Sequence, residues 1–387
     1  MKCSWSDQVY NGTLQRPAKA GPATTFNRQF IDFSAFYNPG TRHQMLPDYP
    51  CATPPAAGET LQLAPGIHWL RMPLPFALNH INLWLLEDDD GWVIVDTGFA
   101  LDAVKDCWRQ ILARLASTKP GGKVSRIIVT HFHPDHLGLA AWLQDLTGAP
   151  LLMTLGEYLT AHAVWHEVGG HGNQPMLRQF RAHGLDAERC AALERRSSGY
   201  NRGVPRIPDH YQRLFADDVL TIGKHRWQVR VGFGHSPEHA ALYSADLGVL
   251  ISGDMLLPKI STNISVFAVT PTADSLADFL HSIDAYRELP SETLVLPSHG
   301  LPFHGIENRV NALHAHHEER LLVLEERCAT PRSAAELLIT LFSRDLDTHQ
   351  TMFAMGEAIA HLNRLEHAGR LLRLEDDEGR VRFVRKS

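Results

Sequence analysis

The run THFHPDHLG, residues 130–138, constrains the fold of this chain more than any other segment. It follows a β-branched apolar stretch and precedes an apolar helical pattern, so we expect it to form the turn between a buried strand and a helix. Alternate residues of extended backbone share a face, and His131 and His133 can therefore point at one ion. Asp135 and His136, at the start of the helix, can reach a second ion. The sequence therefore predicts a metal-binding turn at the end of a strand.

Further ligands are expected downstream, because one short motif cannot enclose two ions. His235 follows a predicted strand, while Asp254 and His299 each end another. Taken alone, a single histidine after a strand is more often structural than a ligand. As an ordered set, these residues supply what the first motif lacks. Two neighbouring cations repel each other, so a shared anionic ligand is needed, and Asp254 is the natural bridge.

Composition excludes several classes of protein. The 387 residues carry a net charge of −6 and are 44% hydrophobic, which argues against a basic nucleic-acid binder and against a disordered polyelectrolyte. No run approaches 18 apolar residues, so no membrane span or membrane partner is expected. The five cysteines are odd in number and form no C-x-x-C pair, which argues against a disulfide framework and a thiolate zinc site. We therefore expect a cytoplasmic protein.

The pattern along the chain divides it into three parts. Residues 1–58 are rich in Pro, Gly, Ala and Thr and are expected to form an N-terminal extension. Residues 59–305 alternate strand and helix patterns and contain all the candidate ligands, so they are the expected catalytic domain. Within them, residues 155–225 read as helices joined by Gly-rich segments. Residues 306–387 read as helices followed by two short alternating strands, which is the order of a winged-helix module.

The seven candidate ligands resemble the pattern of the metallo-β-lactamase-fold hydrolases, the superfamily of glyoxalase II, lactonases, arylsulfatases and zinc-dependent nucleases. The pattern H-x-H-x-D-H, followed by H, D and H, is matched in order, and the resemblance covers about residues 60–305. It implies an α+β fold, an αββα sandwich of two mixed sheets, here with a helical lid insertion and a small C-terminal winged-helix-like domain. The aspartate that precedes the first helix in this family matches Asp96, whose implied role is to support the ligands.

The resemblance also implies two metal ions per chain, most simply zinc, with iron or manganese as alternatives. It distributes the ligands as follows: for the first ion His131, His133 and His235, for the second ion Asp135, His136 and His299, and Asp254 as the bridge. A hydroxide held between the ions is the expected nucleophile, because a bound metal lowers the pKa of water. Asp135 is the expected catalytic residue, which orients the hydroxide and passes its proton to the leaving group.

The expected lid, residues 155–225, accounts for the distance of 99 residues between His136 and His235. It is slightly more basic than the rest of the chain, which mildly favours a small anionic substrate. A solvated helical face without a role is the alternative. Four residues of polar loops are expected to contact the substrate: Tyr200, Asn201, Arg202 and Asn263.

Two other polar groups are open to interpretation. Glu238 and His239 follow the candidate ligand in the run HSPEH, and they either orient its imidazole or face outward. His316 and His317 are expected on a helix surface, because no spacing ties them to the motif.

Two functions of different class follow. The leading prediction is a dinuclear metal-dependent hydrolase of a small acyl substrate, a thioester, ester or lactone. The alternative is a metal-dependent nuclease in which the winged helix holds RNA. Residues 331–387 contain 9 Lys+Arg and 9 Asp+Glu, and this neutral balance disfavours nucleic acid. A module that packs on the catalytic domain or forms a homodimer is expected instead. An iron-dependent oxidoreductase of the same fold is a third alternative.

Overall fold

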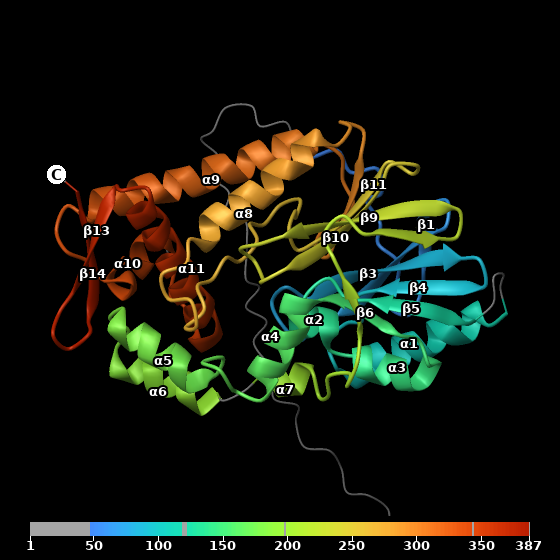
Figure 1. The fold of residues 1–387 in the computed structure, drawn as a ribbon, viewed down its shortest axis with the longest axis horizontal. Helices are drawn as coiled ribbons and strands as arrows, with labels where there is room; N and C mark the ends of the chain where they lie inside the picture. Colours follow the sequence, from blue (N-terminus) through green and yellow to red (C-terminus); the bar gives the residue numbers. More distant parts are fainter. Residues whose placement is uncertain (1–46, 118–121, 197–198, 343, 387) are drawn as a thin grey trace, which may run out of the picture.

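The computed structural model describes residues 47–117, 122–196, 199–342 and 344–386. Two β-sheets pack face to face with helices on their outer sides, and a smaller unit of helices and a hairpin follows (Figure 1). The predicted αββα sandwich with a small C-terminal domain is therefore confirmed. Most of the expected N-terminal extension lies outside the described residues.

The first sheet has seven strands, which follow one another in chain order. They are β1 (Leu61–Ala64), β2 (Ile67–Pro73), β3 (His80–Asp88), β4 (Gly91–Val95), β5 (Val124–Ile128), β6 (Leu151–Thr154) and β7 (Gln212–Leu214). Strands β1 to β4 are antiparallel and β4 to β7 are parallel. Both faces are buried, as β3 shows: Trp84 and Leu86 face the other sheet, while Leu83 and Leu85 face the helices.

The second sheet has five strands in the order β12-β11-β10-β9-β8. They are β8 (Val219–Ile222), β9 (His225–Gly232), β10 (His239–Ser244), β11 (Val249–Gly253) and β12 (Leu294–Pro297). Only β11 and β12 pair in parallel. Side chains of both sheets meet in one apolar core that includes Trp69, Trp227 and Val229. This packing brings the ends of β5, β9, β11 and β12 to one region of the sandwich.

Helices α1 (Asp102–Leu115) and α3 (Ala140–Thr147) cover the first sheet, with the short α2 (Pro134–Leu137) between them in sequence. In α1, Val104, Trp108 and Ile111 recur at helical spacing and are buried. Helix α8 (Ser275–Asp284), extended by the 3₁₀ turn Ala285–Glu288, packs against the second sheet. None of the helices within the described ranges is long and apolar enough to cross a membrane.

The C-terminal unit contains α9 (Ile306–Arg327), α10 (Ala334–Leu341), α11 (Thr348–His367) and the hairpin of β13 (Leu371–Glu375) and β14 (Val381–Arg385). Ser333 and Asp347 begin α10 and α11 with reciprocal capping hydrogen bonds, which explains where these helices start. The order of helices and hairpin agrees with the sequence pattern. That the unit is a winged helix, or forms a homodimer, stays a prediction.

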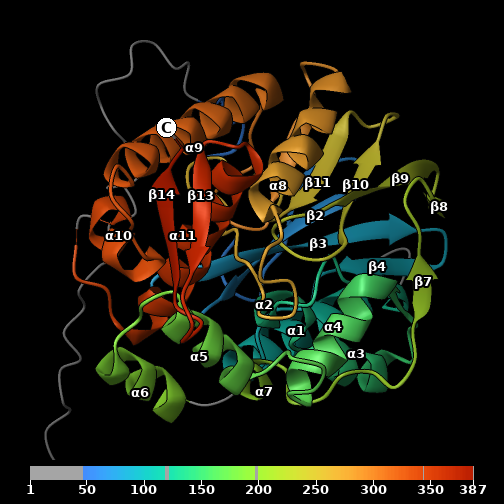
Figure 2. The ribbon, with the colours of Figure 1, turned by 60° about the vertical axis from the view of Figure 1, so that its left-hand side comes forward.

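The described part of the insertion, residues 155–225, contains strands as well as the predicted helices, and its role as a lid stays a prediction. Its helices are α4 (Leu155–Trp165), α5 (Asn173–Ala182), α6 (Ala187–Arg196) and α7 (Tyr200–Gly203). Helices α5 and α6 lie beside α11 and the hairpin (Figure 2), and Leu177 and Phe180 share the apolar core of that unit. Residues 212–222 form the edge strands β7 and β8 instead of helix. These strands are short and largely exposed, so pairing with β6 and β9, not a local apolar pattern, determines them.

The expected surface position of His317 is wrong. The buried residues of α9 recur every three or four positions, and His317 occupies one of these positions between Leu313 and Leu321. Its Nδ1 lies 3.1 Å from Nε2 of His361 in α11, and Nδ1 of His361 donates to the carbonyl oxygen of Glu357 at 2.8 Å. Both imidazoles are therefore buried in the core that joins α9 and α11.

The buried His361 should make folding stability depend on pH. Burial lowers its pKa to about 4, below the ordinary value of 6.5 that the unfolded chain retains. Above pH 6.5 both states are neutral, so the residue contributes nothing. Below pH 6.5 only the unfolded chain takes up the proton, and the free energy of unfolding falls by up to ~1.4 kcal/mol per pH unit until about pH 4.

Urea unfolding at pH 7 and pH 5 measures this effect. We expect His361→Gln to remove about 2 kcal/mol of the difference between the two conditions. His281→Gln, on the exposed face of α8, is the control and should leave the difference as it is in the wild type. An equal pH dependence in wild type and His361→Gln would contradict the assignment.

Candidate metal centre

The predicted metal-binding turn follows β5, whose last residues Ile127 and Ile128 are fully buried and anchor it. His131 and His133 lie in this turn, and α2 begins immediately afterwards with Pro134 at its first position. Asp135 and His136 lie in α2. The remaining candidate ligands, His235, Asp254 and His299, lie just beyond the ends of β9, β11 and β12. The structure therefore brings together segments that are up to 168 positions apart in the sequence, from His131 to His299.

The first group of candidate ligands consists of His131, His133, His235 and Asp254, whose donor atoms all lie within 4.8 Å of one another. Nε2 of His131 is 2.9 Å from Nδ1 of His133 and 3.2 Å from Nε2 of His235. Oδ2 of Asp254 is 3.5 Å from Nε2 of His235. Three imidazole nitrogens and one carboxylate oxygen thus converge on one point.

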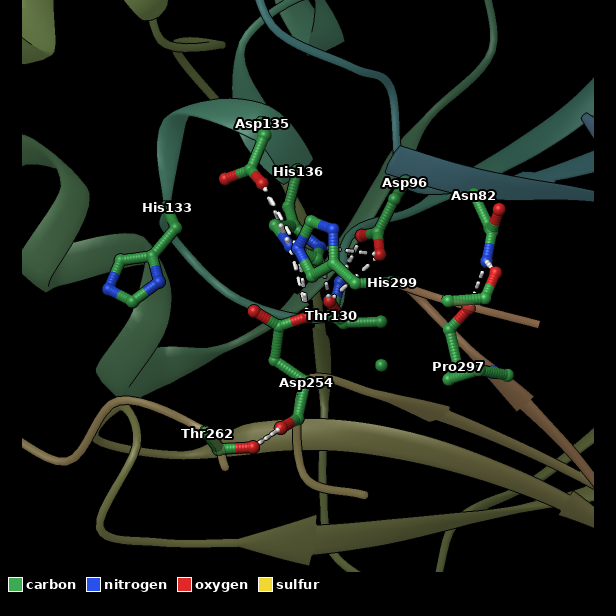
Figure 3. A network of polar contacts seen from close by, with 12 residues as sticks. Asn82, Asp96, Thr130, His133, Asp135, His136, Asp254, Thr262, Pro297 and His299 are labelled. Carbon is green, nitrogen blue, oxygen red and sulfur yellow. Dashed lines mark hydrogen bonds and ion pairs between the residues drawn. The ribbon is translucent and has the colours of Figure 1, made fainter. Parts of the chain in front are cut away.

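The second group consists of Asp135, His136 and His299, again within 4.8 Å of one another. Figure 3 shows these side chains directed toward Asp254. Oδ1 of Asp254 is 3.6 Å from Nε2 of His136 and 3.5 Å from Nε2 of His299. Since its Oδ2 faces the first group, the Asp254 carboxylate stands between the two groups.

The chemistry of these donors fits two divalent cations. Burial lowers the pKa of His131 well below its usual value and that of His133 to about 3, so both offer neutral lone pairs. Within the described part of the chain, Nε2 of His136 and Oδ1 of Asp254 are buried and have no hydrogen-bond partner. Unpaired buried polar atoms are costly, and a cation between these two would satisfy both.

Each imidazole that would bind through Nε2 is oriented by a contact at Nδ1. Nδ1 of His136 lies 2.8 Å from Oδ2 of Asp96, while Nδ1 of His235 and of His299 lie 2.8 and 2.9 Å from the main-chain oxygens of Asn263 and His80. Such contacts fix the tautomer and leave Nε2 free to bind metal.

Comparison with known proteins identifies the fold family. Residues 78–299 match the Metallo-beta-lactamase superfamily, and residues 321–386 match the family described as Metallo-beta-lactamase-like, C-terminal domain. The chain belongs to the metallo-beta-lactamase superfamily. The resemblance inferred from the ligand pattern is confirmed, and with it the expectation of a hydrolase.

The chain is similar to three named proteins. One is a beta-lactamase domain protein from Burkholderia ambifaria, whose crystal structure superposes on this chain with a TM-score of 0.81. The two sequences are 46% identical, and the match covers 88% of this chain and 98% of that protein's chain. The probable metallo-hydrolase YqjP of Bacillus subtilis is 24% identical over 77% of this chain and 91% of its own length. A hydroxyacylglutathione hydrolase of Pseudomonas aeruginosa is 36% identical over 24% of this chain and 33% of its own length.

In this member of the superfamily, Asp96 makes three contacts with the metal-binding segment, one of them with His136 of the second group. Besides His136, its carboxylate accepts from the main-chain N–H of Thr130 at 2.8 Å and from the hydroxyl of Thr130 at 3.0 Å. The left-handed φ of 63° at Asp96 turns the chain sharply after β4 and places the carboxylate under the turn. Asp96 therefore supports both the backbone of the motif and one imidazole.

We expect Asp96→Asn to weaken metal binding at the second group. The asparagine keeps the shape but has one accepting oxygen, so it cannot serve both Thr130 and His136. The affinity for zinc at that position should fall about 10–100-fold. Competition with a chelator measures it, and Asp102→Asn, whose side chain is 95% exposed on α1, is the control. An unchanged affinity in Asp96→Asn would show that Asp96 has no part in holding the imidazole.

His239 faces inward, which excludes the outward-facing interpretation for this residue of the run HSPEH. It is fully buried, and burial lowers its pKa, so the imidazole is neutral. Its Nε2 accepts the main-chain N–H of Asp254 at 3.1 Å. Gly253, with a left-handed φ of 55°, packs directly on this ring, where a Cβ would lie 2.4 Å from Nε2. His239 thus helps to place the shared carboxylate.

The residues expected to contact substrate lie in different surroundings. The hydroxyl of Tyr200 donates to the carbonyl oxygen of Phe132 at 2.7 Å, so this side chain supports the metal-binding turn. Oδ1 of Asn201 is buried, and no described group pairs with it. Arg202 is exposed on α7, and Asn263 contributes its main-chain oxygen to His235. A substrate contact by any of these residues stays a prediction.

The sequence analysis did not find Glu157 of α4, which lies close to the first group. Its carboxylate is fully buried and accepts hydrogen bonds from the turns that carry His131, His133 and His235. Burial raises the pKa of Glu157 to about 7, although the hydrogen bonds oppose this shift. The one available sequence signal is an acidic residue on the apolar side of α4, next to Thr160 and Ala161.

Proposed function

We propose that this protein is a dinuclear metal-dependent hydrolase that cleaves a small acyl substrate, a thioester, ester or lactone. The observation that carries the proposal is the position of Asp254. Its two oxygens face two separate groups of ligands, at 3.5 Å from His235 on one side and 3.5 Å from His299 on the other. A carboxylate shared in this way suits a pair of cations rather than one.

Zinc is the proposed metal, since imidazole and carboxylate donors in four-atom groups suit it, with iron and manganese as alternatives. The first position would be held by His131, His133 and His235, and the second by Asp135, His136 and His299. When bound, such a pair supplies a water of lowered pKa and a Lewis acid for the substrate oxygen.

Asp135 is the proposed proton carrier. Its side chain is 20% exposed, more than the 4% of His299 and the 11% of Asp254 beside it. Oδ2 of Asp135 lies 3.5 Å from Nε2 of His299, which orients the carboxylate. The Asp135 carboxylate can therefore take a proton on the solvent side of the site and pass it to the leaving group.

Two observations favour an acyl substrate over RNA, the name of one relative and the charge balance of the C-terminal unit. The name of the hydroxyacylglutathione hydrolase relative supports an acyl substrate. Basic residues of the C-terminal unit pair with carboxylates of the same protein, which lowers the positive charge that RNA would need. The pairs involve Arg332, Arg364, Arg370, Arg373 and Arg380. That the substrate is small and anionic remains part of the proposal.

Metal analysis and a substrate panel test this function. Protein purified without chelators should contain about two transition-metal ions per chain, as a shared carboxylate requires. The panel contains acyl thioesters, lactones and single-stranded RNA, and we expect turnover of at least one acyl class and none of RNA. Absence of any transition metal, or cleavage of RNA alone, would contradict the proposal.

A further inference from the structure

We infer that Glu157 is a positioning residue that holds the three imidazoles of the first group in the geometry needed to bind one metal ion. Its loss should therefore lower the metal affinity of the first position and leave that of the second position unchanged. This inference rests on the proposed metal centre. It adds a residue that lies outside the ligand motif and that touches neither metal position itself.

One carboxylate connects two separate turns. Oε2 of Glu157 accepts the main-chain N–H of Phe132 at 2.9 Å. Its Oε1 accepts the hydroxyl of Ser236 at 2.7 Å and the main-chain N–H of Glu238 at 2.7 Å. Phe132 stands between His131 and His133, and Ser236 follows His235. The carboxylate therefore ties together the two turns that carry every imidazole of the first group.

A second glutamate, Glu238, makes the reciprocal contacts with α4, which further restrains the two turns relative to this helix. Oε2 of Glu238 accepts the main-chain N–H of Gly156 at the start of α4 at 2.8 Å. The hydroxyl of Thr154 donates to the carbonyl oxygen of Glu238 at 2.7 Å. A Cβ at Gly156 would lie 2.9 Å from Cγ and Cδ of Glu238, so this glycine leaves the room that the second glutamate needs. Each glutamate thus binds the backbone next to the other.

The second group is supported by other contacts. His136 is held by Asp96 and Thr130, and His299 by the main-chain oxygen of His80. None of these contacts includes Glu157. Loss of the Glu157 carboxylate should therefore loosen the first group while the second keeps its geometry. A general loss of folding would affect both groups together, which separates positioning from a merely structural role.

Glu157→Gln is the decisive change, because glutamine has the same shape but only one accepting oxygen. Its amide NH₂ would face donors on one of the two turns, so at least one connection breaks. Ser236→Ala removes one of the three hydrogen bonds and keeps the carboxylate, which gives a milder second variant. Glu188→Gln on the exposed face of α6 is the matched control.

The readout is zinc affinity by chelator competition on the full chain, measured in two backgrounds. In His299→Ala the first position is retained, and there Glu157→Gln should weaken zinc binding about 10–100-fold. In His235→Ala the second position is retained, and the same change should alter affinity by less than about threefold. Ser236→Ala should give a smaller loss in the first background alone, and Glu188→Gln none in either.

Equal losses in both backgrounds, or no loss in either, would overturn the inference. If Glu157→Gln does not fold, as judged by circular dichroism, the selectivity of Ser236→Ala decides in the same way. The readout is metal affinity, so it does not depend on hydrolysis. If the wild-type protein binds two zinc ions but hydrolyses no substrate, the proposed function is contradicted and the inference about Glu157 is not. A wild-type protein that binds no zinc would overturn both.

Discussion

Replacing Asp254 by alanine is expected to lower kcat/KM by at least about 10³-fold, which corresponds to about 4 kcal/mol at the transition state. The physical reason is the position of the carboxylate. Among the described residues, only Asp254 has one carboxylate oxygen facing each ligand group. Its Oδ2 lies 3.5 Å from Nε2 of His235, and its Oδ1 lies 3.5 Å from Nε2 of His299. Without it, two cations would face each other with no anion between them, so zinc content should also fall.

Steady-state kinetics and elemental analysis of Asp254→Ala measure both effects. Asp246→Ala, on the exposed turn between β10 and β11, is the control and should keep kcat/KM within about twofold of the wild type. If Asp254→Ala retained wild-type turnover and two metals per chain, the shared position of the carboxylate would be wrong. Loss of turnover with full metal content would instead assign Asp254 to substrate or proton handling.

The candidate metal centre could be predicted from the sequence because its residues follow a rule of position. A run such as Ile127 to Val129 identifies a buried strand, and the residue after a strand end is placed by the sheet rather than by a flexible loop. His235, Asp254 and His299 each follow such a run, so their order in the chain carries spatial information. The αββα sandwich was implied by the family resemblance, which the order of the seven candidate ligands supports.

The contacts that orient the ligands could not be predicted in the same way. Glu157, Asn263 and His80 act on or through main-chain N–H and carbonyl groups, and every residue has these, so no side-chain pattern marks the partner. His239 was left open for the same reason, because its partner is the main-chain N–H of Asp254. His317 was misplaced because a histidine within an apolar helical spacing is counted as polar.

The insertion shows a different limit. Its helices were expected from their periodicity, but which surface they cover depends on residues far away in the sequence. Phe180 of α5 shares a core with Phe383 of β14, about 200 positions later, and no local pattern indicates this pairing. The apolar faces of α5 and α6 pack on the C-terminal unit, whereas α4 and α7 contact the metal-binding turn through Glu157 and Tyr200. That the insertion acts as a lid over the metals stays a prediction.

The apolar core shared by the insertion and the C-terminal unit should make the loss of Phe383 strongly destabilising. Phe383 is fully buried, the ring of His183 from the insertion stacks on it at 6.0 Å, and Arg373 lies over its face at 4.9 Å. We expect Phe383→Ala to lower the free energy of unfolding by about 3–5 kcal/mol, because the lost contacts leave a cavity that the hairpin cannot fill. Leu372→Ala, on the same hairpin but 46% exposed, is the control and should cost less than about 0.5 kcal/mol.

Urea unfolding followed by circular dichroism and by tryptophan fluorescence measures the loss and also tests cooperativity. The cluster that contains Phe383 continues without a break to Leu250 and Val295 of the second sheet. The tryptophans Trp69, Trp84 and Trp227 lie in the core between the two sheets, far along the chain from the hairpin. Both signals should therefore shift together in Phe383→Ala. A separate early transition seen by circular dichroism alone would mean that the C-terminal unit unfolds by itself. The core that this unit shares with the insertion would then not couple its unfolding to that of the metal-binding sandwich.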